Sequence, residues 1–160
     1  MRNPLEYARV LLATLAALIV TATAAAQQAP LEDLSAFPKA QLTVKGSGVS
    51  HAFTIWVADT ASRDEQGLMF VRELPADRGM VFQDSEPKAW AMWMRNTFIP
   101  LDMLFVGTDG HITQIAHAIP HDETIIRSSL AVKAVIELQG GITDRLHIKV
   151  GDQASWKPLP

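Results

Sequence analysis

The residue best suited to chemistry is Asp102, a carboxylate that interrupts the apolar run of residues 99–106. An ionised carboxylate is costly to bury unless it is paired and hydrogen-bonded. Arg63, Arg72 or Arg95 could be the partner, because a guanidinium binds a carboxylate through two parallel hydrogen bonds. Asp102 therefore either forms a structural ion pair between a helix and the sheet, or forms one wall of a ligand pocket.

Trp93, Arg95 and Asn96 precede Asp102 closely in the sequence and could border the same pocket. Exposed aromatic side chains on a β-sandwich can stack on sugar rings, and arginine and aspartate add directional hydrogen bonds. A buried tryptophan and an asparagine in a turn are the ordinary alternatives. We predict a non-enzymatic domain that binds a small polar ligand, such as a glycan fragment or another component of the cell envelope. The predicted ligand-binding residues are Arg63, Arg72, Trp93, Arg95, Asn96 and Asp102.

A hydrolase with two carboxylates is the first alternative, because enzymes that cleave glycans use such a pair. Asp102 and Glu137 both fall in expected strands and could approach each other. His121, Ser128 and Ser129 could provide a base and a nucleophile, but no spacing links them, and the sequence has no G-x-S-x-G motif. The sequence therefore favours binding over catalysis.

Methionine offers a second alternative, a Cu(I) site, because thioethers beside an aromatic ring suit this soft ion. Met92 and Met94 flank Trp93 and would share one face of a strand. Methionine is also a common filler of apolar cores, and core packing is the simpler interpretation. His117 and His121 have a proline between them and do not share a helix face as zinc-binding histidines do. We therefore expect no metal and no cofactor.

The apolar segments that would carry these residues are short, alternate with a period of two and are separated by turn residues. Strands are predicted at residues 53–57, 90–94, 101–106, 111–117 and 131–138. An Asp-Gly turn at residues 109–110 predicts a hairpin between two of these strands. Asp59 and Thr60 can begin a helix over residues 61–70. The pattern predicts a mainly β sandwich or barrel with one or two short helices.

Residues 1–26 have the pattern of a cleavable signal peptide. Two arginines come first, an apolar run follows at residues 10–20, and small residues end at Ala26. The run is shorter than the roughly 20 residues that cross a bilayer, so no membrane span is expected after cleavage. We expect a flexible leader at residues 27–40, one domain at residues 41–160, and a periplasmic or secreted location.

Charge and cysteine content restrict the partners of this domain. The formal net charge is −3, and a mildly acidic chain lacks the basic surface that phosphate backbones attract. The chain has no cysteine, so no disulfide or thiolate metal site can form. We expect no nucleic-acid partner and a fold held together by its apolar core, and the sequence predicts no particular oligomeric state.

Several longer motifs resemble the DUF192 family, which is also called UPF0127. They are the segments at residues 63–72, 79–82, 92–97, 99–102 and 136–138, followed by Gly140-Gly141 and Gly151-Asp152. The resemblance spans residues 53–152. It implies a compact, jelly-roll-like β sandwich that is often exported, and it implies no catalytic residues because the function of the family is unassigned.

Overall fold

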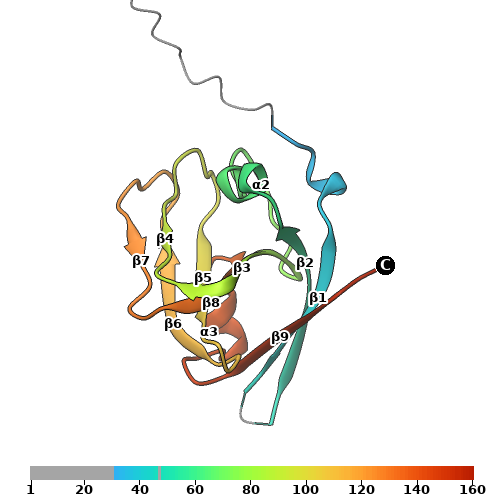
Figure 1. Cartoon of the computed structure of the whole chain (residues 1–160), viewed down its shortest axis with the longest axis vertical. Helices are drawn as coiled ribbons and strands as arrows, with labels where there is room; N and C mark the ends of the chain where they lie inside the picture. The colour runs from blue at the N-terminus through green and yellow to red at the C-terminus, as the bar shows by residue number, and fades with distance from the viewer. Residues whose placement is uncertain (1–30, 47) are drawn as a thin grey trace, which may run out of the picture. The chain divides into compact units, whose positions relative to one another are not determined.

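The computed structural model describes residues 31–46 and 48–160, which form a curved, mainly β structure (Figure 1). The predicted signal peptide and the first residues of the predicted leader lie outside the described residues. The helical elements are the 3-10 turn η1 (Leu34–Ala36), α2 (Ala61–Gln66) and α3 (Ile142–Leu146). The strands are β1 (Lys39–Lys45), β2 (Ser50–Ala58), β3 (Arg78–Lys88), β4 (Ala91–Met92), β5 (Leu101–Val106), β6 (Ile112–Ala118), β7 (Ile126–Arg127), β8 (Val132–Gln139) and β9 (Gln153–Pro158).

Seven strands form one sheet in the order β6-β5-β8-β3-β2-β1-β9, and β4 pairs with β7 in a separate two-stranded sheet. Neighbours in the large sheet are antiparallel except β2 and β3, which are parallel. Parallel neighbours need a crossover connection, and α2 lies in this one (Figure 1). The large sheet is not closed, although an isolated bridge joins His111 to Gln153 in β9. This architecture confirms the predicted mainly β class with short helices.

The large sheet has an apolar cluster on each face, because side chains alternate along each strand. One cluster includes Met80, Met103 and Val135, whereas the other includes Leu104 and Leu138. In the β5–β8 pair, Met103 lies opposite residue 137, and residue 102 lies opposite Leu138. The two acidic residues of these strands therefore belong to opposite faces of the sheet.

Helix α2 begins where the sequence predicts and ends four residues earlier. The Thr60 side chain accepts a hydrogen bond from the Arg63 N–H at 3.3 Å, as an N-cap residue does. Gly67 then has a φ of 49°, and Phe70 has a φ of 63°. Both values lie in the left-handed region, which interrupts a right-handed helix. The chain therefore leaves α2 at Gly67 and turns across the first apolar cluster.

The segment before β1 contacts the sheet and α2. Phe37 is 2% exposed, and Leu34 packs against the first apolar cluster. The backbone N–H of Glu32 donates to the Gln66 side chain at 2.7 Å. Regular structure therefore begins before residue 41, where the domain was expected to start. Among the described residues, none of the helices has the length and apolar character needed to cross a membrane.

Candidate functional site

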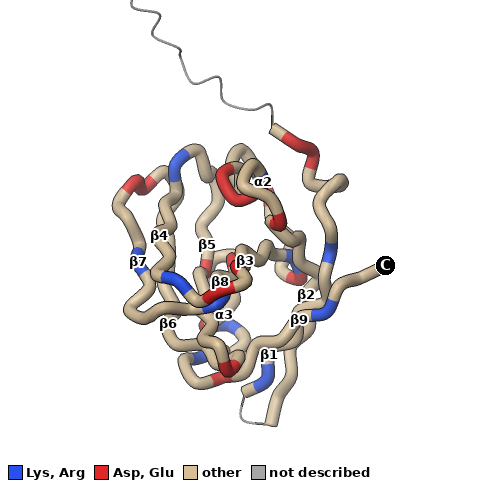
Figure 2. Tube along the Cα trace, viewed as in Figure 1, with Lys and Arg blue, Asp and Glu red and all other residues tan. Residues whose placement is uncertain are grey.

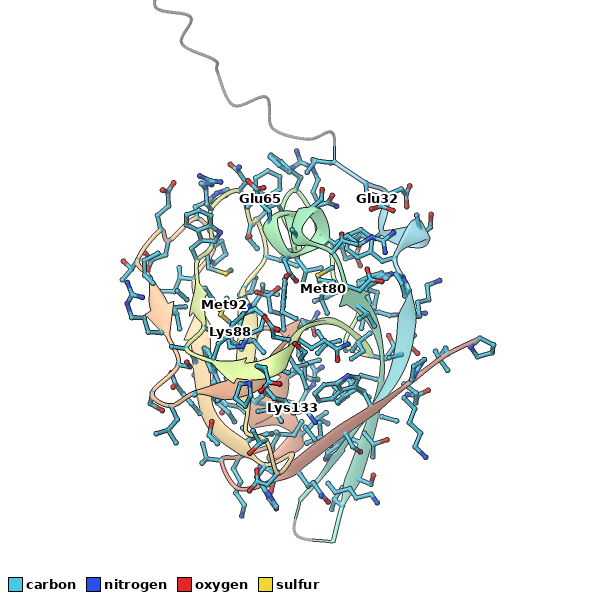
Figure 3. All side chains as sticks on the ribbon, viewed as in Figure 1. Glu32, Glu65, Met80, Lys88, Met92 and Lys133 are labelled. Atoms are coloured by element: carbon cyan, nitrogen blue, oxygen red, sulfur yellow. The ribbon has the colours of Figure 1, made fainter. Side chains whose placement is uncertain are left out.

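A small pocket lies where the C-terminal end of α2 meets the turn after β4 and the strand β8. Its lining includes Asp64, Met69, Met92, Trp93, Arg95 and Glu137, and we call it the α2 pocket. It encloses about 40 Å³ of free space. Figure 3 shows Met92 below α2. Met92 belongs to the first apolar cluster. Residues far apart in the sequence thus meet at one site.

Glu137 places a carboxyl group in the buried wall of this pocket. It stands on β8 between Met80 of β3 and Met103 of β5, and it is 4% exposed. Burial raises its pKa to about 8, since the charged form loses its hydration. No hydrogen bond or ion pair from another described residue offsets this effect. The carboxyl group therefore keeps its proton at neutral pH.

Arg95 brings a charged donor to the same pocket. Its guanidinium lies over the Trp93 ring, 4.2 Å from the ring centre. Its Nε is buried and has no hydrogen-bond partner among the described residues. The turn that presents it is held by the Thr97 N–H, which donates to the Met94 carbonyl at 3.1 Å, and by Asn96, whose φ is 56°. One buried N–H donor of an arginine that lines the pocket is thus left without a partner in the described part of the chain.

Two unsatisfied polar groups in one concave site are uncommon in a folded protein. Nearly all buried polar atoms have a hydrogen-bond partner, so exceptions need an explanation. Around Arg95 and Glu137 the pocket is lined by the thioethers of Met69 and Met92 and by Trp93, which is 40% exposed. Apolar walls with a few convergent polar groups are typical of small-molecule sites. This arrangement can hold and orient a polar group of a ligand.

Asp102 lies on the other face of the sheet and is fully hydrogen-bonded. It accepts from the Thr143 N–H at 2.8 Å, the Thr143 hydroxyl at 2.7 Å and the Gly141 N–H at 3.0 Å. The ring Nδ1 of His117 lies 2.8 Å from the Asp102 Oδ1, the same oxygen that accepts from Gly141. Asp102 therefore fixes the start of α3 against β5. The prediction that an arginine pairs with Asp102 is wrong, because backbone donors and a histidine take that place.

These contacts set the charge states of Asp102 and His117. Burial alone would raise the pKa of Asp102, but the Thr143 N–H, the His117 ring and the Thr143 hydroxyl together lower it below its usual value. The hydrogen bond to Asp102 raises the pKa of His117, whose side chain is 58% exposed. A charged pair at this position has a structural role, because it anchors the start of α3 to β5.

Of the six predicted ligand-binding residues, the structure brings Trp93 and Arg95 into the α2 pocket. Arg63 instead binds Glu32 and Asp59, with N–O distances of 2.6 Å to each. Arg72 lies over the Phe98 ring at 4.9 Å, and the Asn96 amide is 4.0 Å from the Met69 sulfur. These three residues and Asp102 are not among the residues that line the α2 pocket.

The structure also bears on both alternatives. Asp102 and Glu137 lie on opposite faces of the sheet, so they cannot flank one bond as the two carboxylates of a glycosidase do. Met92 and Met94 both pack in the first apolar cluster, and Met92 lines the α2 pocket. Among the described residues, no three histidine, aspartate or glutamate side chains are grouped to hold a metal ion.

Most residues that line the pocket, among them Glu137, Asp64 and Met69, were not predicted as ligand-binding residues. Glu137 alternates with apolar neighbours in the sequence, and its acidic type within an apolar strand is the signal that could have found it. Asp64 and Met69 leave no such signal, because Asp64 lies on α2 and Met69 follows the turn at Gly67, and their approach to β8 depends on tertiary structure. The Asp64 carboxyl lies partly out of water at the rim of the pocket, and this burial raises its pKa.

A family model and two solved structures are similar to this chain. A model of the DUF192 family, described as an uncharacterized ACR, matches residues 41–156. A crystal structure from Novosphingobium aromaticivorans DSM 12444, named as a protein of unknown function, is 39% identical with a TM-score of 0.75, and the match covers 79% of this chain and 91% of that one. No curated protein matches the chain.

A second crystal structure is from Sinorhizobium meliloti 1021, and its name suggests a transcription regulator. It is 40% identical with a TM-score of 0.73, and the match covers 75% of this chain and 95% of that one. The family match spans most of the described residues, and both solved structures share the fold. The chain therefore belongs to the DUF192 family.

Proposed function

We propose that this chain is an exported, non-enzymatic domain that binds a small polar ligand in the α2 pocket. One observation carries the proposal: the Glu137 carboxyl and the Arg95 Nε are both without partners and line the same pocket. A ligand that satisfied both groups would complete the hydrogen bonding of the site. Strongly perturbed carboxyl groups in a cleft are candidates for functional residues.

The energetic argument supports a site rather than an accident of packing. A buried polar group without a partner costs about 1–3 kcal/mol, and an apolar side chain of similar shape would avoid that cost. Proteins keep such destabilising groups mainly where function needs them. Arg95 and Glu137 come from separate elements and both line this pocket.

Export is proposed from residues 1–26, whose charged start, apolar run and small residues fit a signal peptide. Mass spectrometry of the chain isolated from cells tests it, because cleavage after Ala26 leaves Gln27 at the N-terminus. A chain that retains residues 1–26 in the cytoplasm would contradict export without affecting the pocket.

DNA binding is not proposed, despite the name of the Sinorhizobium meliloti protein. The formal net charge of this chain is −3. Figure 2 shows lysine and arginine interspersed with aspartate and glutamate along the described chain rather than gathered on one element. A protein that holds phosphate backbones needs a basic face.

A ligand panel tests the binding function. The methyl groups of Met69 and Met92 line the pocket, so their NMR signals report occupancy. The panel contains neutral sugars, uronic acids, organic acids, amino acids, short peptides and amines. We expect at least one class to shift both signals saturably, and we expect Arg95→Gln to weaken that binding about tenfold or more, since a charge-assisted hydrogen bond is lost.

The matched control is Arg72→Gln, which removes an arginine that lies over Phe98 outside the pocket. It should leave the affinity unchanged. If every class fails to shift the methionine signals, or if both arginine variants reduce binding equally, the α2 pocket is not the binding site.

A further inference from the structure

We propose that the group recognised by the α2 pocket is a carboxylate, held between the Arg95 guanidinium and the protonated carboxyl of Glu137. This inference rests on the proposed function and specifies the class of its ligand. It starts from the lining of the pocket, where one positive group and one neutral acid face the same small space.

Charge balance is the first step. Arg95 carries a positive charge, and no salt bridge in the described residues involves it. A buried charge is stabilised by a counter-charge with good hydrogen-bonding geometry. A ligand carboxylate supplies one, whereas an amine would add a second positive charge and a neutral hydroxyl would add none.

Hydrogen-bond complementarity is the second step. A carboxylate has only acceptors, and both unsatisfied groups of the pocket can donate. One ligand oxygen accepts from the guanidinium of Arg95, which lines the pocket, and the other accepts from the Glu137 hydroxyl. Both bonds are charge-assisted and therefore stronger than bonds between neutral groups. A neutral carbonyl or hydroxyl oxygen can accept the same hydrogen bonds but does not neutralise the arginine.

Size is the third step. The free space is about 40 Å³, and a single water molecule needs roughly 10–15 Å³ on this measure. The pocket therefore accepts a group of a few atoms, such as a carboxylate, and excludes a whole sugar ring. The rest of the ligand would lie outside against Trp93, which is 40% exposed. The ligand is thus an acid that enters by its carboxylate end.

The remaining charged groups act at the rim. Asp64 and Glu65 face the pocket from α2, and both residues are exposed. The charge of Lys88 lowers the pKa of Asp64, and Asp84 and Asp59 raise it, so these groups partly offset one another. Glu137 is the only acidic group of the lining that is buried. It is therefore the group whose proton decides whether an anion can enter.

This arrangement gives the binding a defined pH dependence. Glu137 can donate only while it is protonated, and burial places its pKa at about 8. Above that pH, two carboxylates would face each other in the pocket. The affinity for a carboxylate should therefore fall above pH 8, by about fivefold over the first pH unit and by nearly tenfold per unit beyond it, because one proton must be bound with the ligand.

The test compares acetate, acetamide and methylammonium, which have similar size and different charge. Binding to the full chain is followed by the methyl signals of Met69 and Met92 at pH 7, 8 and 9. We expect acetate to bind at least tenfold more tightly than the other two at pH 7 and to lose about fivefold between pH 8 and 9. Glu137→Gln keeps a neutral donor, so it should bind acetate equally at all three pH values.

The outcomes separate this inference from the proposed function. If acetamide or methylammonium binds as tightly as acetate, or if the pH dependence persists in Glu137→Gln, the carboxylate assignment is overturned while a polar-ligand pocket remains. If neither these probes nor any compound of the panel shifts the methionine signals, both proposals fail. Glucuronate and N-acetylalanine then distinguish an acidic sugar from a peptide C-terminus as the source of the carboxylate.

Discussion

The two buried acids of the large sheet, Asp102 and Glu137, stand on neighbouring strands and have opposite environments. Asp102 accepts hydrogen bonds from Thr143, Gly141 and His117, and its pKa is lowered. Glu137 has no such donors, and its pKa is raised to about 8. Both residues are almost completely buried, at 1% and 4% exposure. Burial alone therefore does not decide the charge of an acid, and the donors around it do.

The comparison also separates two roles. The charge of Asp102 is used within the fold, since it fixes α3 against β5. The neutral acid of Glu137 contributes nothing comparable to the fold, and it faces a pocket with another unsatisfied group. A buried acid with a complete set of partners indicates structure, whereas one without partners beside a pocket indicates function.

Removal of the structural acid should have the largest effect. Asp102→Ala leaves the Thr143 and Gly141 donors buried without an acceptor, and we expect it to lower the free energy of unfolding by about 3–5 kcal/mol. Urea denaturation measures this loss. Acetate binding at the α2 pocket should survive under conditions where the variant remains folded. A loss below about 1 kcal/mol would mean that α3 does not depend on this acid.

The pH dependence of stability gives the next largest effect. The pKa of Glu137 is raised from 4.5 to about 8 in the folded state, so the folded protein binds more protons than the unfolded chain between these values. Stability should therefore fall as the pH rises from about 5 to 8, by at most about 1.4 kcal/mol per pH unit. Urea denaturation at several pH values measures the slope.

Glu137→Gln is the control for this slope, because the amide does not titrate. We expect the stability of the variant to change much less over the same pH range. An equal slope in both proteins would assign the effect to another group and would remove the contrast between the two acids. Asp102 should act in the opposite sense, since its lowered pKa makes stability fall as the pH drops below about 4.

The smallest effect should come from His117. Its pKa is raised by Asp102, so the charged pair stabilises the fold below the usual histidine pKa and this contribution is lost as the pH rises through the folded value. Because the side chain is 58% exposed, solvent screening limits the effect of His117→Gln to less than about 1 kcal/mol. Thermal unfolding at pH 6 and pH 9 checks it. An equal loss at both pH values would indicate packing rather than charge.

The local signals of the sequence account for much of the fold. The cap at Thr60 fixed the start of α2, and the Asp-Gly turn at residues 109–110 predicted the β5–β6 hairpin. That hairpin pairs Asp102 with His117, so counting residues outward from the turn could have found the partner of Asp102. The predicted strand at residues 90–94 shortens to Ala91–Met92, because the chain must turn at Asn96.

The candidate site was harder to predict because its parts come from distant segments. Trp93 and Arg95 lie two residues apart in one turn, and the sequence analysis placed both in the predicted site. The donors of Asp102 are backbone N–H groups at the start of α3, which no residue type reveals. The Glu137 carboxyl has no hydrogen-bond partner among the described residues because β8 is a central strand, with β3 on one side and β5 on the other. Only tertiary structure determines these environments.

The assembly of the α2 pocket from a helix end, a turn and a central strand has a thermodynamic consequence. Unfolding any of these elements removes the site, so a ligand that binds the pocket binds only the folded chain. Mass action then couples occupancy to the melting temperature: a ligand at about one hundred times its dissociation constant would add about 2.7 kcal/mol to the free energy of unfolding. Melting curves alone can therefore rank candidate acids from a crude library, without a labelled probe and before any of them is known to bind.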